Sequence, residues 1–207
     1  MEKILQSYID LREKSKNYGD DLVAIKPNIE NVFAMIFNNA TVVLEVLDNY
    51  DRYWKRKYVG IPQQKIDELK EQNAERVMEI TKWSFTHALS SLEYSAKKII
   101  KNISQIEFQD LKNKLQRGKW VYLSGIMEIS KTSGLITKED YDRWEGITYL
   151  RNCLVHNNGI ADKDKTFTIR TVNIKCENGK MIQGKLDIFY NLTDVSVDLY
   201  NDWLHKI

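Results

Sequence analysis

The stretch that organises this chain is Trp144-Glu-Gly-Ile-Thr-Tyr-Leu-Arg151-Asn152-Cys-Leu-Val-His156-Asn-Asn-Gly159. Within it, Ile147, Leu150 and Leu154 follow the i, i+3, i+7 spacing of one buried stripe, which predicts an amphipathic helix. Gly159 is expected to lie just beyond the helix end in a left-handed conformation. The sequence therefore predicts a helix that buries one face and carries a group of polar side chains in its last turns.

Those polar side chains are Arg151, Asn152 and His156. Asn152 and His156 are four residues apart and share a helix face, while Arg151 starts about 100° around the helix but has a long side chain. Arginine binds phosphate with a fork of donors, histidine exchanges a proton near neutral pH, and asparagine can hold either group in place. The three suffice for metal-free RNA cleavage, in which a 2′-hydroxyl attacks its own phosphate. The simpler alternative is that Arg151 and His156 only cap the helix carbonyls.

The motif Arg151-Asn-Cys-Leu-Val-His156 resembles the R-x4-H signature of the HEPN (higher eukaryotes and prokaryotes nucleotide-binding) superfamily. In that family a polar residue directly after the arginine, here Asn152, is associated with active members. The resemblance covers roughly residues 28 to 160, and only the motif helix matches residue by residue. Asn158 departs from the toxin members paired with nucleotidyltransferase antitoxins, which often have a tyrosine there. That departure argues against regulation by modification of such a tyrosine.

The resemblance implies a helical bundle that forms a homodimer through its motif helices. Two copies of Arg151 and His156 would then build one composite site across a cleft. Members of the family serve in defence against phage, in toxin–antitoxin pairs or in RNA processing, and a regulatory partner protein is a further expectation.

Composition and charge limit the other possibilities. A chain of 207 residues with 43% apolar residues fits one globular domain. The formal net charge is +2, so any contact with nucleic acid must come from a local patch. Cys153 and Cys176 form neither a disulfide framework nor a CxxC zinc site, and they fit a reducing cytosol.

Known motifs for cofactors and targeting are missing from the sequence. There is no Gly-rich phosphate loop and no metal-ligand spacing, so we expect neither a cofactor nor a metal. The N-terminus does not resemble a signal peptide, and no run is expected to reach the ~20 apolar residues that span a membrane. We therefore expect a cytoplasmic protein.

Apolar periodicity predicts a mainly α fold, an antiparallel helical bundle over residues 1–160. Gly19-Asp-Asp is expected to interrupt the first helix, Asn28 to cap the second, and Thr137 to open the motif helix with a box-like cap ending at Asp140. The region 63–102 predicts one long helix or two nearly collinear ones. The helices expected before the motif helix span residues 2–17, 29–53, 63–102 and 120–130, with a short segment at 104–119.

After Gly159 the pattern changes from helix to strand. Residues 166–175 alternate and are β-branched, Glu177-Asn-Gly-Lys180 is a strong hairpin turn, and 181–190 reads as the returning strand. Asn191 or Thr193 is expected to cap a final helix. We expect residues 161–207, the hairpin and terminal helix, to pack on the bundle within the same domain, because an isolated hairpin is marginal in water.

Several basic residues are candidates for RNA phosphate contacts. Charge runs are more commonly solvated helix ends, and the basic and aromatic stretch 51–58 allows the same two interpretations. Glu93 and Lys97 either orient the motif residues or form a surface ion pair. His87 and His205 are expected to be structural. The candidate RNA contacts are Lys97, Lys101, Lys112, Lys114 and Arg117.

The leading hypothesis from the sequence is a metal-independent endoribonuclease of HEPN type. His156 would act as general base or acid, Arg151 as the phosphate clamp and Asn152 as the orienting group. The alternative is a non-catalytic HEPN-like module that binds RNA, a nucleotide or another protein. A third possibility is a structural helical protein in which Arg151 and His156 are caps.

Overall fold

The structure is a computed structural model that describes the whole chain except residues 28, 171, 183 and 186. It is mainly α-helical, with a two-stranded antiparallel hairpin near the C-terminus and a terminal helix after it, which confirms the predicted fold class. The elements of the described residues, in chain order, are α1 (Glu2–Ile25), α2 (Val32–Lys57), α3 (Gln63–Asn102), the 3-10 turn η1 (Ile106–Phe108), α4 (Gln109–Gln116), α5 (Leu123–Thr132), α6 (Lys138–His156), β1 (Lys165–Ile169), β2 (Val172–Cys176) and α7 (Ile188–Lys206).

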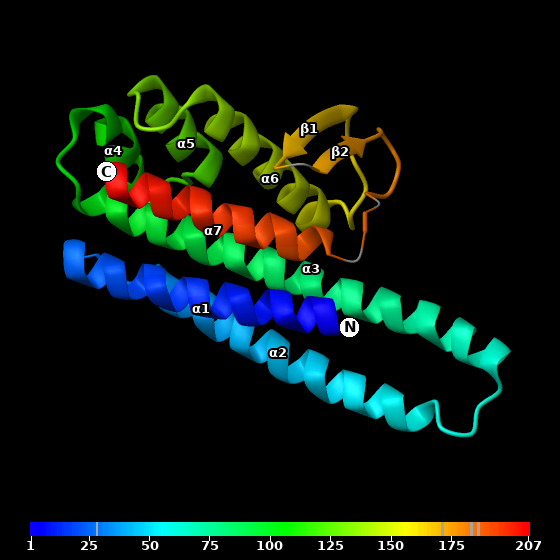
Figure 1. The fold of residues 1–207 in the computed structure, drawn as a ribbon. Coiled ribbons are helices and arrows are strands. Elements are labelled where there is room, and N and C mark those ends of the chain that lie inside the picture. Colours follow the sequence, from blue (N-terminus) through cyan, green and yellow to red (C-terminus); the bar gives the residue numbers. More distant parts are fainter. Residues whose placement is uncertain (28, 171, 183, 186) are drawn as a thin grey trace.

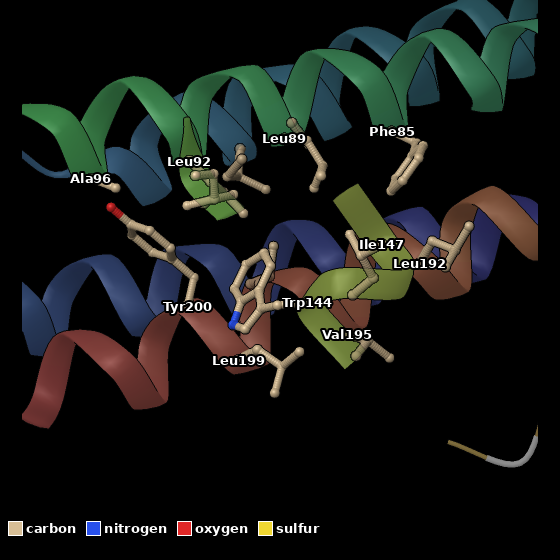
Figure 2. Packing of buried hydrophobic residues seen from close by; sticks show 14 of the residues in the cluster. Phe85, Leu89, Leu92, Ala96, Trp144, Ile147, Leu192, Val195, Leu199 and Tyr200 are labelled. Carbon is tan, nitrogen blue, oxygen red and sulfur yellow. The ribbon is translucent and has the colours of Figure 1, made fainter. Parts of the chain in front are cut away.

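The terminal helix α7 lies inside the bundle, packed against α1, α3 and α6 (Figure 1). Figure 2 shows the centre of this packing, where Phe85 and Leu89 of α3 and Ile147 of α6 lie close to Leu192 and Val195 of α7. Each fully buried side chain of this kind stabilises the fold by roughly 1.5–3 kcal/mol. The last helix of the chain is thus a central element of the core.

Neighbouring helices do not all alternate in direction. α1 and α2 are antiparallel, as are α2 and α3, but α3 and α7 run the same way (Figure 1). Phe85 stacks on Phe189 with ring centroids 6.0 Å apart, and further along both helices Gln105 Nε2 donates to the Ile207 carbonyl at 3.0 Å. This parallel pair is possible because α4, α5, α6 and the hairpin lie between the two helices in the sequence and return the chain to its starting end.

The first helix does not end near Gly19. α1 continues unbroken to Ile25, so the predicted interruption at Gly19 is wrong. A Cβ atom at Gly19 would lie 2.8 Å from Asn31 Nδ2, so the glycine allows α1 and the start of α2 to approach closely. Asn31 is fixed there because its side-chain oxygen accepts the Ala34 N–H and caps α2.

Three other helix boundaries differ from the predictions. The expected cap Asn28 lies outside the described residues. α2 runs from Val32 to Lys57, not from 29 to 53, and it begins at Val32 because Asn31 supplies its N-cap. α3, by contrast, covers the predicted range. It is one continuous helix, which decides between the two possibilities that the sequence left open. α5 begins at Leu123, not at residue 120, because Tyr122 before it is extended.

By length and composition alone, α2 could span a membrane, which corrects the expectation that no run qualifies. The core helix of a soluble protein meets the same criterion. In the described structure α2 is tied to α3 by polar contacts of the buried residue Asn39. Ser84 Oγ donates to Asn39 Oδ1 at 2.7 Å, and Asn39 Nδ2 lies 2.8 Å from His87 Nδ1.

The β-hairpin occupies a shorter stretch than predicted. Residues 166–175, expected to form one strand, fold back at Arg170 and supply both strands, with Lys165 opposite Cys176 and Ile169 opposite Val172. Arg170 has a φ of 52°, a left-handed conformation suited to a tight hairpin turn. The prediction was wrong because no glycine or asparagine marks this turn in the sequence.

The expected turn at 177–180 exists, but it does not connect two paired strands. Lys180 N–H donates to the Glu177 carbonyl at 3.0 Å, and the chain then pairs with the segment after α6, where Ile182 N–H donates to the Gly159 carbonyl at 2.8 Å. The predicted returning strand 181–190 is therefore wrong, and α7 already begins at Ile188.

The predicted cap of the last helix is wrong for the same reason. Thr193 lies inside α7 and donates to the Phe189 carbonyl, and Asn191 also lies within the helix. The residue at the N-cap position is Asp187.

Ion pairs fasten the hairpin to α7. Arg170 contacts Asp194 at 2.7 Å and Asp198 at 2.6 Å, and Lys14 of α1 reaches the same two carboxylates at 2.5 Å and 2.9 Å. Tyr18 donates to Asp198 at 3.0 Å, and burial together with this carboxylate raises the pKa of Tyr18 to about 12. Two cations and two carboxylates thus join α1, the hairpin and α7.

The other attachment of the hairpin is to α6. Phe167 of β1 lies directly over Gly146, so that a Cβ at Gly146 would come within 2.5 Å of the Phe167 ring. The hairpin can pack this closely on the motif helix only because residue 146 has no side chain.

We expect Gly146→Ala to lower the free energy of unfolding by about 1–3 kcal/mol, because the added methyl group displaces the Phe167 ring. The matched control is Gly125→Ala in α5, where an added Cβ meets open space and alanine should raise stability by about 0.5–1 kcal/mol. Urea unfolding of both variants checks the opposite signs. Two variants of equal stability would contradict the close packing of Phe167 on α6.

Candidate functional site

The helix that carries the candidate site has well-defined ends. At its start, the Thr137 side chain accepts the Asp140 N–H at 3.1 Å and donates to the Asp140 carboxylate at 2.8 Å, which confirms the predicted cap. α6 ends at His156, as predicted, and Gly159 follows with a φ of 81°. The Gly159 N–H donates to the Cys153 carbonyl at 2.9 Å and satisfies one of the last carbonyls of the helix.

One face of α6 is buried against the bundle. The predicted stripe Ile147, Leu150 and Leu154 is buried, and Trp144 and Cys153 extend it. Burial of this stripe fixes the rotation of the helix, and therefore the direction in which the polar residues point.

Arg151 and Asn152 lie together at the surface. Arg151 is half-buried, Asn152 is exposed, and Arg151 Nη1 donates to Asn152 Oδ1 at 3.1 Å. This bond joins two side chains, and in the part of the chain that the structure describes Arg151 makes no bond to a helix carbonyl. The remaining donors of the Arg151 guanidinium stay available for an anion.

His156 is exposed in the last turn of α6. It lies on the same side of the helix as Asn152, about 40° around the axis, and about one turn further along. Among the described residues its ring nitrogens make no hydrogen bond. Its imidazole is therefore accessible to solvent, with its position set by the helix backbone.

A small open cavity of about 180 Å³ contains Arg151 and Asn152 but not His156. It lies between α3, the start of α5 and the outer side of α6. Its lining residues are Leu89, Glu93, Tyr122, Leu123, Ser124, Thr148, Arg151 and Asn152.

Glu93 brings a negative charge to this cavity. Its carboxylate lies 2.5 Å from Lys97 Nζ, and both side chains are mostly buried, with 18% of Glu93 and 22% of Lys97 exposed. The sequence presented two interpretations of this pair. The structure shows the ion pair itself, and Glu93 also lines the cavity with Arg151, but among the described residues it makes no hydrogen bond or ion pair with Arg151 or His156. Lys97 offsets the negative charge that would otherwise repel an anion bound by Arg151.

Tyr122 was missed by the sequence analysis, which placed it within a helix. The residue precedes α5 in an extended conformation and lines the cavity with 61% of its side chain exposed. The signal that could have revealed it is the alternation Trp120-Val121-Tyr122, in which a single buried apolar residue separates two aromatic ones.

The candidate RNA contacts fall into separate places. Lys97 lies beside the cavity through its pair with Glu93, and Lys101 is exposed one turn further along α3. The three remaining candidates lie in or just after α4, next to the C-terminal end of α7, whereas α6 ends beside the chain segment that leads into α7 (Figure 1). Those three candidates are Lys112, Lys114 and Arg117.

Lys112 already has a hydrogen-bond partner within the protein, because its ammonium donates to the Ile103 carbonyl at 3.1 Å. The other two histidines also have local partners. His87 contacts Asn39 and stacks on Trp83, and His205 Nδ1 lies 2.8 Å from the Asn201 carbonyl. These contacts support the structural roles expected for both.

A larger cavity of about 640 Å³ lies between the hairpin and the start of α7, away from the motif residues. Arg170 in its wall is already paired with Asp194 and Asp198. Lys175, also in its wall, is paired with Glu177. Of the two cavities, only the smaller one is lined by motif residues, so it is the better candidate for chemistry.

Neither a metal centre nor a similarity to known proteins indicates a second candidate site in the part of the chain that the structure describes. Among the described residues, no group of three or more His, Cys, Asp or Glu side chains is placed to hold a metal ion. No protein-family model, curated protein or solved structure matches the chain.

We expect Thr137→Ala to lower the free energy of unfolding by about 1 kcal/mol, because α6 loses its side-chain cap. Thr137→Ser keeps the accepting oxygen and should retain most of that stability. Urea unfolding measures the difference, and hydrogen exchange should locate it in the first turn of α6. An alanine variant as stable as the wild type would show that this cap does not hold the start of the helix.

Proposed function

We propose that this protein is a metal-independent endoribonuclease of HEPN type. The observation that carries the proposal is the arrangement at the end of α6. Arg151 and Asn152 are hydrogen-bonded to each other at an open cavity, and the exposed His156 lies about one turn beyond Asn152 on the same side of α6.

Each of the three side chains has a distinct role in the proposed reaction. The Arg151 guanidinium binds the scissile phosphate and stabilises the charge that develops on it, and Asn152 holds the guanidinium in place. His156 takes the proton from the 2′-hydroxyl, whose oxygen attacks the adjacent phosphorus while the bond to the 5′-oxygen breaks. A second imidazole gives its proton to that leaving oxygen, so the products are a 2′,3′-cyclic phosphate and a 5′-hydroxyl.

The need for two imidazoles supports a homodimer. A single chain offers one histidine at this site, and the exposed side of the last turns of α6 carries Asn152, Val155 and His156 together. Val155 has 47% of its side chain exposed and supplies an apolar contact between two such helices. In a two-fold dimer one His156 acts as base and its copy acts as acid.

The alternative is a module that binds RNA, a nucleotide or a protein without cleaving RNA. One observation favours it, since His156 does not line the cavity that contains Arg151. The two proposals differ in the need for His156, because binding by Arg151 and its neighbours requires no proton transfer.

The setting in the cell is part of the proposal. The chain would act in the cytoplasm on RNA, in phage defence or as a toxin, under the control of a regulatory partner. Two buried free thiols, Cys153 and Cys176, are compatible with a reducing compartment.

The test is cleavage of a mixed pool of structured and unstructured RNAs in EDTA by the purified protein. Arg151→Ala and His156→Ala should each slow cleavage by about 100-fold or more, because each removes a transition-state contact or a proton-transfer group. The matched controls are Arg143→Ala, an arginine of α6 paired with Glu139 and Asp140, and His205→Ala, an exposed histidine of α7. Both controls should cleave at the wild-type rate.

Other results would contradict the proposal. Equal cleavage by all variants would indicate a contaminating nuclease. No cleavage by a folded dimer that still binds RNA through Arg151 would favour the binding module. Light scattering should report a dimer, and a monomer that cleaves RNA would refute the composite site.

A further inference from the structure

The segment between α4 and α5 presents two aromatic rings to solvent beside the candidate site. Val121 is buried, with 3% of its side chain exposed, while Trp120 on one side of it has 81% exposed and Tyr122 on the other has 61% exposed. Tyr122 is extended, with φ −101° and ψ 153°. Because side chains alternate along an extended segment, burial of Val121 directs both rings outward.

The backbone of this segment is held at both ends. The Lys119 N–H donates to the Lys114 carbonyl at 2.9 Å, and the Tyr122 carbonyl accepts the Gly125 N–H at 3.1 Å at the start of α5. The aromatic rings therefore project from an anchored backbone.

Both rings adjoin the groups of the candidate site. Tyr122 lines the same cavity as Arg151 and Asn152. The Trp120 ring centroid lies 6.0 Å from Lys97 Nζ, and Lys97 is paired with Glu93, which lines the cavity as well. The aromatic pair thus extends the surface of the cavity toward Lys97 of α3.

We propose that Trp120 and Tyr122 form a subsite that stacks the unpaired bases of single-stranded RNA whose phosphate is bound by Arg151. The inference rests on the proposed function for its ligand. Aromatic side chains stack on any base, and cations beside them bind the phosphates that link the bases. A base in a duplex has both faces covered by its neighbours, so the subsite selects single strands and discriminates little between sequences.

The subsite is tested by binding, separately from cleavage. The full-length His156→Ala variant serves as the parent, so that bound RNA stays intact. The probes are a fluorescein-labelled 12-nucleotide RNA of mixed sequence and the same RNA annealed to its complement. Trp120→Ala and Tyr122→Ala should each weaken single-strand binding by about 10-fold and change duplex binding by less than about 2-fold. Trp120→Phe keeps an aromatic face and should retain most of the affinity.

The matched controls are two partly exposed aromatic residues of α3, outside the segment that carries Trp120 and Tyr122. Trp83 has 50% of its side chain exposed and stacks on His87, and it precedes Glu93 by ten residues, about 15 Å along the helix. Tyr94 has 49% exposed and, like Trp120, has a lysine ammonium near its ring, that of Lys98 at 4.6 Å. Trp83→Ala and Tyr94→Ala should bind both probes as the parent does.

The outcomes separate the subsite from the nuclease. Single-strand binding unchanged in both Trp120→Ala and Tyr122→Ala would overturn the subsite, even if wild-type protein cleaves RNA. Equal loss of single-strand and duplex binding would also overturn it, since that pattern indicates a backbone contact. A parent that binds neither probe refutes the subsite as well, while the cleavage assay decides on the nuclease. Trp120-dependent binding without any cleavage would support the subsite and refute the nuclease.

Discussion

Burial of α7 is the constraint on which the rest of this structure depends. The helix has buried side chains around most of its circumference, so it needs partners on several sides. α3, α6 and α1 supply those partners, although they come from distant parts of the sequence. Polar residues within α7 are compatible with this position because Thr193 and Ser196 donate to carbonyls of their own helix. The start and the end of the chain are thereby held in one core.

The position of α7 also determines where the hairpin attaches and how it packs on α6. Asp194 is buried on α7 and carries a charge that needs partners, which Arg170 and Lys14 provide. With Arg170 held there, Phe167 lies against Gly146 in the middle of α6. The segment after α6 is further fixed by pairing with the chain that leads into α7. The middle of α6 and the segment that follows the helix are therefore both held in place.

The candidate site combines side chains of different chemical character from three parts of the chain. α6 contributes the cation Arg151, α3 contributes the paired Glu93 and Lys97, and the segment before α5 contributes aromatic rings. A carboxylate beside the proposed phosphate clamp weakens anion binding unless it is neutralised, and Lys97 does so at short range. This charge balance is compatible with the proposed binding of a phosphate and its attached base.

The sequence by itself determined the features that depend on neighbouring residues. The apolar stripe of α6, its cap at Thr137 and its end at His156 follow from local periodicity and from hydrogen bonds between side chain and backbone, and so does the turn at 177–180. The sequence also located α3, but it left open whether this region is one helix or two, and the structure shows one. Tertiary structure alone decided which strands pair, why Gly19 lies inside a helix, and that Glu93 and Tyr122 meet Arg151. These features depend on contacts between residues far apart in the chain, and local patterns carry no information about which distant surface a residue meets.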